Sequence, residues 1–152
     1  MGKLSEKTGR VSVLMADDDR DDQLLVQKAL AAVEAAEGTA FVNDGQELLD
    51  FLNLCRNRPE PPRVKFPSLI LLDLNMPRMD GREALQILKA DGELREIPVV
   101  ILTTSKQPED KNLSYGSGAN FYITKPENFP DFVEIMRFLK VFWVKKPEGP
   151  HS

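Results

Sequence analysis

The chain has 152 residues, 41% of them hydrophobic and 29% charged, which fits one soluble domain with a buried core and leaves little room for a second. A net charge of −4 gives no general reason to expect binding to nucleic acid or to a membrane. The N-terminal residues lack the apolar run that is typical of a signal peptide. The single cysteine, Cys55, cannot form an internal disulfide, which suits the cytoplasm. The single histidine, His151, argues against metal centres or catalytic triads that need imidazole.

Short apolar segments alternate with segments of helical periodicity along the chain. Apolar residues at 26, 29, 30 and 33 show the spacing of one helix face, and Asp44 with Glu47 has the pattern of a helix cap. This alternation predicts an α/β fold, a flavodoxin-like doubly wound (βα)5 arrangement with a five-stranded parallel sheet. The predicted strands are 11–16, 39–42, 68–73, 97–102 and 121–124, with helices around 26–33, 44–55, 81–88, 109–115 and 129–144.

Polar side chains stand at the ends of four predicted strands. Asp17 and Asp18 follow the first strand, Asp73 the third, Thr103 the fourth and Lys125 the fifth. In a doubly wound sheet ligands bind at the carboxyl ends of the strands, so these side chains are predicted to converge. Three packed carboxylates that stay ionised need a cation, and hard oxygen ligands favour Mg²⁺. Such a carboxylate can attack phosphorus while the metal and Lys125 neutralise the developing charge.

Four motifs, in order, resemble the receiver domain of two-component response regulators: MADDD, LLDLNMPRMDG, LTTS and TKP. The resemblance covers almost the whole chain and is specific, because each motif lies at the end of the correct strand. It implies that Asp73 accepts a phosphoryl group from a sensor histidine kinase. The long basic loop before LILLDLNMP and the Phe142-Trp143 ending are similar to single-domain regulators paired with bacterial phytochromes, which implies a phytochrome as the kinase.

The resemblance also implies a role for each further residue of the site. Asp18 would bind Mg²⁺ directly and Asp17 mainly through water. Pro126 would form a cis peptide that sets the direction of the lysine before it. The remaining metal ligands would be Asp73 and the backbone carbonyl of Asn75, and the phosphoryl-contacting and switch residues would be Thr103, Thr104, Lys125 and Tyr122.

Asp19, Asp21 and Asp22 extend the acidic cluster beyond the two carboxylates that this mechanism needs next to Asp73. Asp21 and Asp22 are interpreted as residues of a first helical turn, where the helix dipole favours negative charge.

The predicted final helix carries a second apolar stripe, Phe138, Val141 and Phe142, beside the stripe that begins at Phe132. A helix on one sheet face needs only one stripe, so the second predicts a homodimer interface. The predicted domain limits are an N-terminal extension at 1–10, a receiver domain at 11–146 and a C-terminal tail at 147–152. No DNA-binding output domain is expected, and signals would pass through contacts with partners.

Two other functions compete with the receiver interpretation. Phosphohydrolases of the haloacid dehalogenase type also use an aspartate nucleophile, but they place a second carboxylate two residues later, where this chain has Asn75. A receiver that is never phosphorylated could act as a binding scaffold, but the complete set of site residues argues against this. The chain is therefore expected to be a signalling domain, with self-catalysed phosphotransfer and slow autodephosphorylation as its only chemistry.

Overall fold

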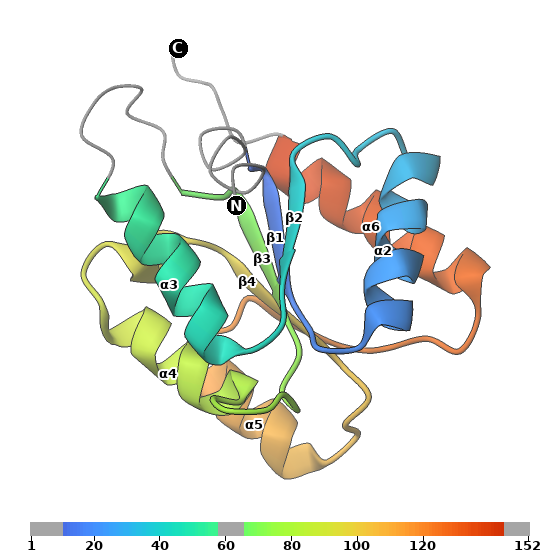
Figure 1. Ribbon diagram of the computed structural model, residues 1–152. Helices are drawn as coiled ribbons and strands as arrows, with labels where there is room; N and C mark the ends of the chain where they lie inside the picture. Colours follow the sequence, from blue (N-terminus) through green and yellow to red (C-terminus); the bar gives the residue numbers. More distant parts are fainter. Residues whose placement is uncertain (1–10, 58–65, 145–152) are drawn as a thin grey trace.

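The computed structural model describes residues 11–57 and 66–144 (Figure 1). Its sheet has five parallel strands in the order β2-β1-β3-β4-β5, which confirms the predicted doubly wound fold. The strands are β1 (Val13–Ala16), β2 (Thr39–Val42), β3 (Leu69–Leu72), β4 (Val99–Thr103) and β5 (Phe121–Thr124). The predicted extension, 1–10, and tail, 147–152, lie outside the described residues.

Helices cover both faces of the sheet (Figure 1). Helices α2 and α6 lie on one face, and α3, α4 and α5 lie on the other. A short 3-10 helix, η2 (Leu94–Glu96), precedes β4 and was not predicted from the sequence. The helices are α2 (Arg20–Ala32), α3 (Gly45–Arg56), α4 (Gly81–Ala90), α5 (Pro108–Gly116) and α6 (Phe129–Val144).

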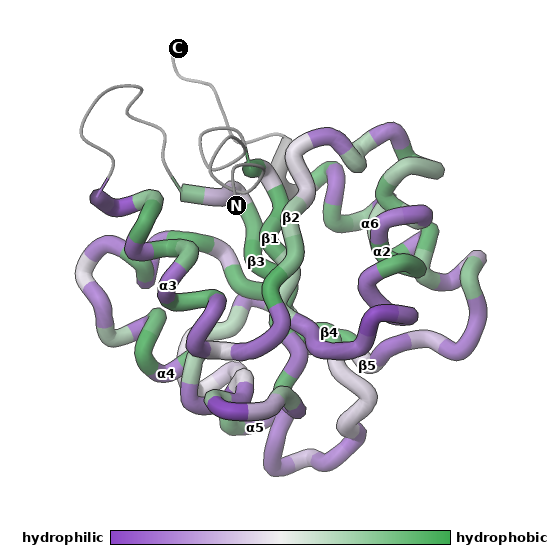
Figure 2. Tube along the Cα trace, in the orientation of Figure 1, coloured by the Kyte–Doolittle hydropathy of each residue, from purple (hydrophilic) through white to green (hydrophobic). Residues whose placement is uncertain are grey.

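The central strands are apolar because both of their faces are covered. All residues of β1 and β3 are buried, and alternate side chains enter two separate cores. Leu14 and Ile70 pack in the core beneath α3 and α4, whereas Met15 and Leu71 pack in the core beneath α2 and α6. Figure 2 shows the apolar strands between the helices and hydrophilic turns at the lower edge of the sheet. Each fully buried leucine contributes roughly 1.5–3 kcal/mol to folding.

Carboxylates start three of the helices at the carboxyl edge of the sheet. Asp19 caps α2, Asp80 caps α4, and Asp44 caps α3 by accepting the backbone N–H of Glu47 at 2.8 Å. The cap predicted at Asp44 is thus confirmed. The Glu47 side chain returns to the backbone N–H of Asn43, one residue before the cap. These caps satisfy free helix N–H groups and add negative charge at this edge.

The two apolar stripes of α6 have different environments. Phe132 and Met136 are almost fully buried against the sheet and α2, whereas Phe138 and Val141 are 52% and 58% exposed. The Phe138 ring packs edge-on against Phe121 with centroids 5.4 Å apart. The side chain of Phe142 lies outside the described residues. Among residues 11–57 and 66–144, no helix combines the length and the apolarity needed to cross a bilayer.

Candidate functional site

The pairing of β1 with β3 brings Asp17 and Asp73 together. Ala16 lies beside Leu72 in the parallel register, so the next residue of each strand leaves the sheet at the same level. The backbone N–H of Asp73 donates to the Ala16 carbonyl at 3.0 Å. The strand order turns back between these two strands, with β2 on one side and β4 on the other. The two aspartates therefore stand at the topological switch point, where doubly wound folds bind ligands.

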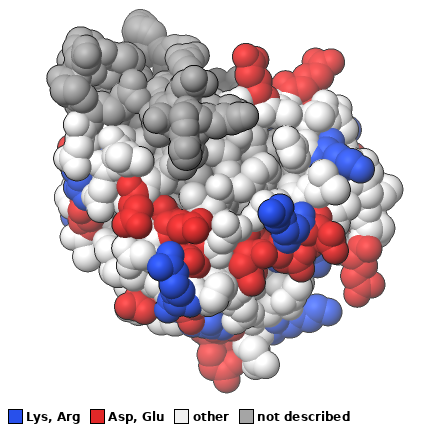
Figure 3. All heavy atoms as spheres, viewed as in Figure 1, with Lys and Arg blue, Asp and Glu red and all other residues white. Residues whose placement is uncertain are grey.

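Asp17, Asp18 and Asp73 form a compact carboxylate cluster. One oxygen atom from each lies within 4.8 Å of the others. Asp17 is fully buried and Asp73 nearly so, while Asp18 is exposed. Burial raises the pKa of the Asp17 carboxyl to about 6, against the opposing effects of Lys125 and of the backbone N–H of Asp19. Figure 3 shows acidic side chains across the middle of one face of the molecule, with Lys and Arg side chains beside them.

Lys125 places one buried cation among the carboxylates. Its Nζ lies 2.7 Å from Asp17 Oδ2 and 3.4 Å from Asp73 Oδ2. Burial alone would lower the pKa of Lys125, but its contacts with Asp17 and Asp22 outweigh burial and raise it. The Lys125 backbone N–H donates to the Thr103 carbonyl at 2.7 Å, so the pairing of β5 with β4 fixes where the side chain begins.

Asp22 makes the shortest of the Lys125 contacts, with Oδ2 at 2.6 Å from Nζ. The interpretation of Asp22 as only a first-turn residue was therefore incomplete. It does lie in the first turn of α2, as does Asp21, but its carboxylate also faces the lysine. Asp21 is exposed, and its contact within the described structure is the capping bond from its backbone N–H to Asp19.

The chemistry of the cluster fits a hard divalent cation. Asp73 Oδ1 is buried and has no hydrogen-bond partner among the described residues. Asp17 Oδ2 faces the Lys125 ammonium group at 2.7 Å. Buried carboxylate oxygens normally have such partners, and oxygen atoms are the ligands that Mg²⁺ and similar ions prefer. The Asn75 side chain is exposed and accepts from Arg82 at 3.3 Å.

Thr103 and Tyr122 both contact Ser105. The buried Thr103 hydroxyl oxygen accepts the Ser105 backbone N–H at 3.3 Å. The half-buried Tyr122 donates its hydroxyl to the Ser105 carbonyl at 2.9 Å. Thr104 is exposed. Ser105, in the loop after β4, thus contacts both Thr103 and Tyr122, two of the predicted phosphoryl-contacting and switch residues. The cis form of the Lys125–Pro126 peptide stays a prediction.

Arg82 and Asp110 form an ion pair beside the site. Neither residue was predicted from the sequence as part of it. Arg82, at the start of α4, donates to both Asp110 carboxylate oxygens in α5 at 2.8 Å and to the Leu74 carbonyl at 3.4 Å. Asp110 also accepts from the Ser105 hydroxyl at 2.6 Å. These contacts connect the loop after Asp73 to the loop after Thr103. Neither residue stands at a strand end, so the rule that found the other site residues could not find them.

Gly81 allows the loop after β3 to fold closely over the strand end. Its backbone N–H donates to the Leu74 carbonyl at 2.9 Å. A Cβ atom at Gly81 would lie 2.0 Å from the carbonyl oxygen of Asp73. Only glycine fits this approach, which holds the backbone of Asp73 in place.

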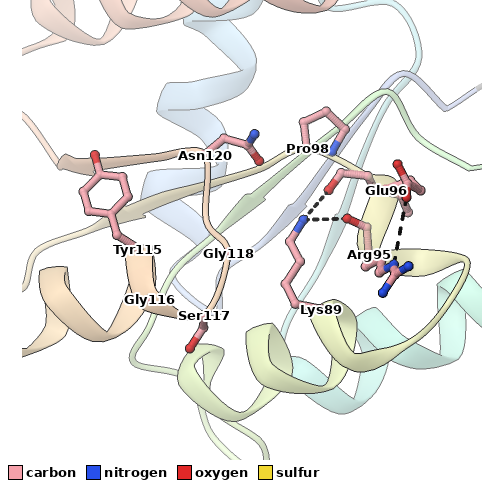
Figure 4. Close-up of a pocket in the computed structure, with 10 residues that line it drawn as sticks. Lys89, Arg95, Glu96, Pro98, Tyr115, Gly116, Ser117, Gly118 and Asn120 are labelled. Carbon is pink, nitrogen blue, oxygen red and sulfur yellow. Dashed lines mark hydrogen bonds and ion pairs between the residues drawn. The ribbon is translucent and has the colours of Figure 1, made fainter.

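A pocket lies at the edge of the sheet opposite the carboxylate cluster (Figure 4). It has a volume of about 570 Å³ and lies near the amino ends of β4 and β5. Lys89 crosses it to donate to the carbonyls of Arg95 and Ile97 at 3.0 and 2.9 Å. The ammonium group of Lys89 is thus already hydrogen-bonded to the backbone. The pocket is remote from the carboxylate cluster.

A family model describing the response regulator receiver domain matches residues 13–137. The chain belongs to this family. Response regulator Rcp1 of Synechocystis is 36% identical over 133 residues, covering 88% of each chain. The probable methanogenesis regulatory protein FilR2 of Methanothrix harundinacea is 31% identical over 149 residues, covering 98% of this chain and 94% of that protein.

Solved receiver structures share the fold of this chain. The phosphorylated cyanobacterial phytochrome response regulator RcpA has a TM-score of 0.76 and 35% identity, and the match covers 93% of this chain and 99% of that one. The Mn²⁺-bound form of Rcp1 has a TM-score of 0.75 and 34% identity, covering 92% and 99%. This receiver domain is therefore a signalling domain homologous to phytochrome response regulators, as the sequence motifs predicted.

Proposed function

We propose that this receiver domain accepts a phosphoryl group on Asp73 from the phosphohistidine of a sensor histidine kinase. The observation that carries the proposal is the environment of Asp73. Its carboxylate is nearly buried at the switch point, with Lys125 beside one oxygen and no hydrogen-bond partner for the other among the described residues. A buried carboxylate held in this way is a candidate nucleophile.

The transfer forms one bond to phosphorus and breaks another. A carboxylate oxygen of Asp73 attacks phosphorus, the P–N bond of phosphohistidine breaks, and the imidazole nitrogen leaves with the bonding electron pair. The product is an acyl phosphate, and its later hydrolysis by water returns the carboxylate and inorganic phosphate. Lys125 neutralises negative charge on the phosphoryl oxygens as it develops.

Asp17, Asp18, Asp73 and the backbone carbonyl of Asn75 are the residues that would hold Mg²⁺. The bound ion would neutralise phosphoryl oxygens and orient them for in-line attack. The burial and close spacing of the carboxylates support this assignment. Burial raises the pKa of Asp17 to about 6, so a cation nearby would favour its ionised form.

The phosphorylated state would be signalled through Ser105 and the two residues that form hydrogen bonds with its backbone, Thr103 and Tyr122. Thr103 and Tyr122 already bond to its N–H and carbonyl, so a displacement of the Thr103 hydroxyl toward the phosphoryl group would alter the contact of Tyr122. Thr104, exposed beside them, would contact the phosphoryl group from the solvent side. Phosphorylation would thus shift a two-state equilibrium of this loop.

The partners proposed are a bacterial phytochrome kinase and a second copy of this chain. The similarity to RcpA and Rcp1 supports a phytochrome as the phosphoryl donor. Two large exposed apolar side chains on α6, Phe138 and Val141, support a homodimer in which Phe142 also takes part. Signals would pass through these protein contacts in the cytoplasm, without binding of nucleic acid or membrane.

Phosphotransfer from candidate kinases, and labelling by acetyl phosphate with Mg²⁺, test the proposal. The wild-type chain is expected to take up one hydroxylamine-sensitive phosphoryl group, and Asp73→Asn is expected to take up none while keeping its fold. Asp50→Asn, an exposed change on α3, is the matched control. Stoichiometric labelling of Asp73→Asn refutes the site. A wild-type chain that is never labelled supports a scaffold, and turnover of p-nitrophenyl phosphate supports a phosphohydrolase.

Lys125→Ala separates the chemical step from the signal. Without the ammonium, the end of β5 loses its ion pair with the phosphoryl group, so labelled protein is expected to show no change in oligomeric state.

A further inference from the structure

Lys125 is shared unequally among three carboxylates. Its Nζ lies 2.6 Å from Asp22, 2.7 Å from Asp17 and 3.4 Å from Asp73. The lysine side chain is only 6% exposed, so water can do little to weaken these contacts. One ammonium group cannot neutralise three carboxylates, and its position is a compromise among them.

The helix dipole does not explain the contact made by Asp22. Asp21 and Asp22 occupy the same first turn of α2, and both backbone N–H groups donate to Asp19. Negative charge is favoured at either position. Only Asp22 turns its side chain inward, where it is 20% exposed and contacts Lys125. This orientation brings the first turn of α2 into contact with the residue that follows β5.

The contact matters because phosphorylation changes what the lysine must neutralise. The acyl phosphate on Asp73 carries roughly two negative charges on its phosphoryl oxygens, in place of the single charge of the carboxylate. The lysine can stabilise them only by approaching the phosphoryl oxygens, and at rest it lies 0.8 Å closer to Asp22 than to Asp73 (3.4 − 2.6 Å). Asp22 therefore competes with the phosphoryl group for the same cation.

We propose that Asp22 is a positioning residue that holds Lys125 toward α2 and away from Asp73 in the unphosphorylated state. This inference rests on the proposed phosphorylation of Asp73. It makes Asp22 a determinant of how strongly the site holds a phosphoryl group. The carboxylate of Asp22 lowers the stability of the phosphorylated state, because Lys125 must weaken its ion pair with Asp22 before it can contact the phosphoryl oxygens on Asp73.

The binding of beryllium fluoride with Mg²⁺, measured by calorimetry, tests this competition, because the fluoride complex on a carboxylate has the charge and shape of a phosphoryl group. Asp22→Asn keeps the size of the side chain and removes its charge, so it is expected to bind the complex roughly five- to tenfold more tightly. Asp22→Glu retains the charge and is expected to restore affinity close to that of the wild type. Asp21→Asn, the matched loss of charge in the same turn, is expected to change affinity less than about twofold.

A double-mutant cycle with Lys125→Met shows whether Asp22 acts through the lysine. In that background, Asp22→Asn is expected to leave the affinity unchanged. An equal gain with and without Lys125 would mean that Asp22 acts only by its general field, and weaker binding by the single variant Asp22→Asn would mean that it supports the phosphorylated state. Either result overturns the proposal.

A crystal structure of unphosphorylated Asp22→Asn provides a readout that does not depend on binding. Nζ of Lys125 is expected to move toward Asp73, and an unchanged position contradicts the inference. A wild-type chain that neither binds the complex nor becomes labelled would instead overturn the proposed function. Wild-type binding that Asp22→Asn does not alter would overturn the role of Asp22 alone.

Discussion

Arg82 at the start of α4 holds Asp110 at the start of α5 through two hydrogen bonds of 2.8 Å. The two residues are 28 positions apart in the chain. The pair connects the loop after β3, which carries Asp73, to the loop that follows Thr103 at the end of β4. Paired bonds between a guanidinium and a carboxylate are among the stronger polar contacts in proteins.

This pair predicts an acid-sensitive contribution to stability. Arg82 first, and then Ser105, lower the pKa of Asp110 to about 2. A carboxyl with a lowered pKa stabilises the fold above its unfolded pKa of about 3.9, and this contribution is lost as the pH falls toward 2.

Asp110→Asn is therefore expected to lower the free energy of unfolding by about 1–3 kcal/mol at pH 7 and by about half as much near pH 3. Urea unfolding at both pH values measures this, with Glu109→Gln in the same helical turn as the control. An equal loss at both pH values would contradict the assigned contact.

Gly81→Ala is expected to disturb the proposed phosphoacceptor, Asp73, directly. Its Cβ would meet the Asp73 carbonyl oxygen at 2.0 Å, so the backbone of the loop must shift. Overpacking of this kind costs about 1–3 kcal/mol in free energy of unfolding, and the rate of labelling should fall. Gly92→Ala, where nothing lies within 4 Å of the new Cβ, is the control. Labelling and stability equal to those of the control would show that the loop adapts freely.

Mg²⁺ is expected to stabilise the chain through Asp18. At about 100 times its dissociation constant, the ion should raise the free energy of unfolding by roughly 2–3 kcal/mol, and removal with EDTA should reverse this. Asp18→Asn should abolish most of the gain because it removes a ligand from the cluster. Thermal unfolding with and without Mg²⁺ measures this gain in stability. Asp21→Asn, which removes one negative charge outside the cluster, is the control. Full stabilisation of Asp18→Asn would exclude Asp18 from the metal site.

Phe138→Ser is expected to weaken self-association. Phe138 is 52% exposed on α6, beside the equally exposed Val141. Burial of such a ring against a second copy would contribute about 1.5–3 kcal/mol, so its removal should raise the dissociation constant at least about tenfold. Sedimentation at micromolar concentration measures this, with Leu54→Ser on α3, 56% exposed, as the control. A wild-type chain that stays monomeric with and without phosphorylation rules out this dimer.

The sequence was sufficient to place the residues at the strand ends. Strands β1 and β3 are continuous apolar segments that are each followed by a carboxylate, and this signal is local in the chain. Parallel strands with helical crossovers bring their carboxyl ends to one edge, so Asp17, Asp73 and Lys125 could be placed together without coordinates. The boundaries were less certain. The first strand was predicted from residue 11 but begins at Val13, and η2 was not predicted.

The sequence could not distinguish Asp22 from Asp21. Both are acidic residues in one helical turn, and the local pattern treats them alike. Asp22 contacts a lysine 103 positions later, and Arg82 likewise finds Asp110 in another helix.

Sequence alone thus determined the fold and the residues at the edge of the sheet, because periodicity and strand ends are properties of neighbouring residues. Tertiary structure decided how one lysine is divided among its carboxylates. That division depends on where the folded chain places the carboxylates of Asp22 and Asp73 around Nζ, and differences below 1 Å decide which contact is stronger.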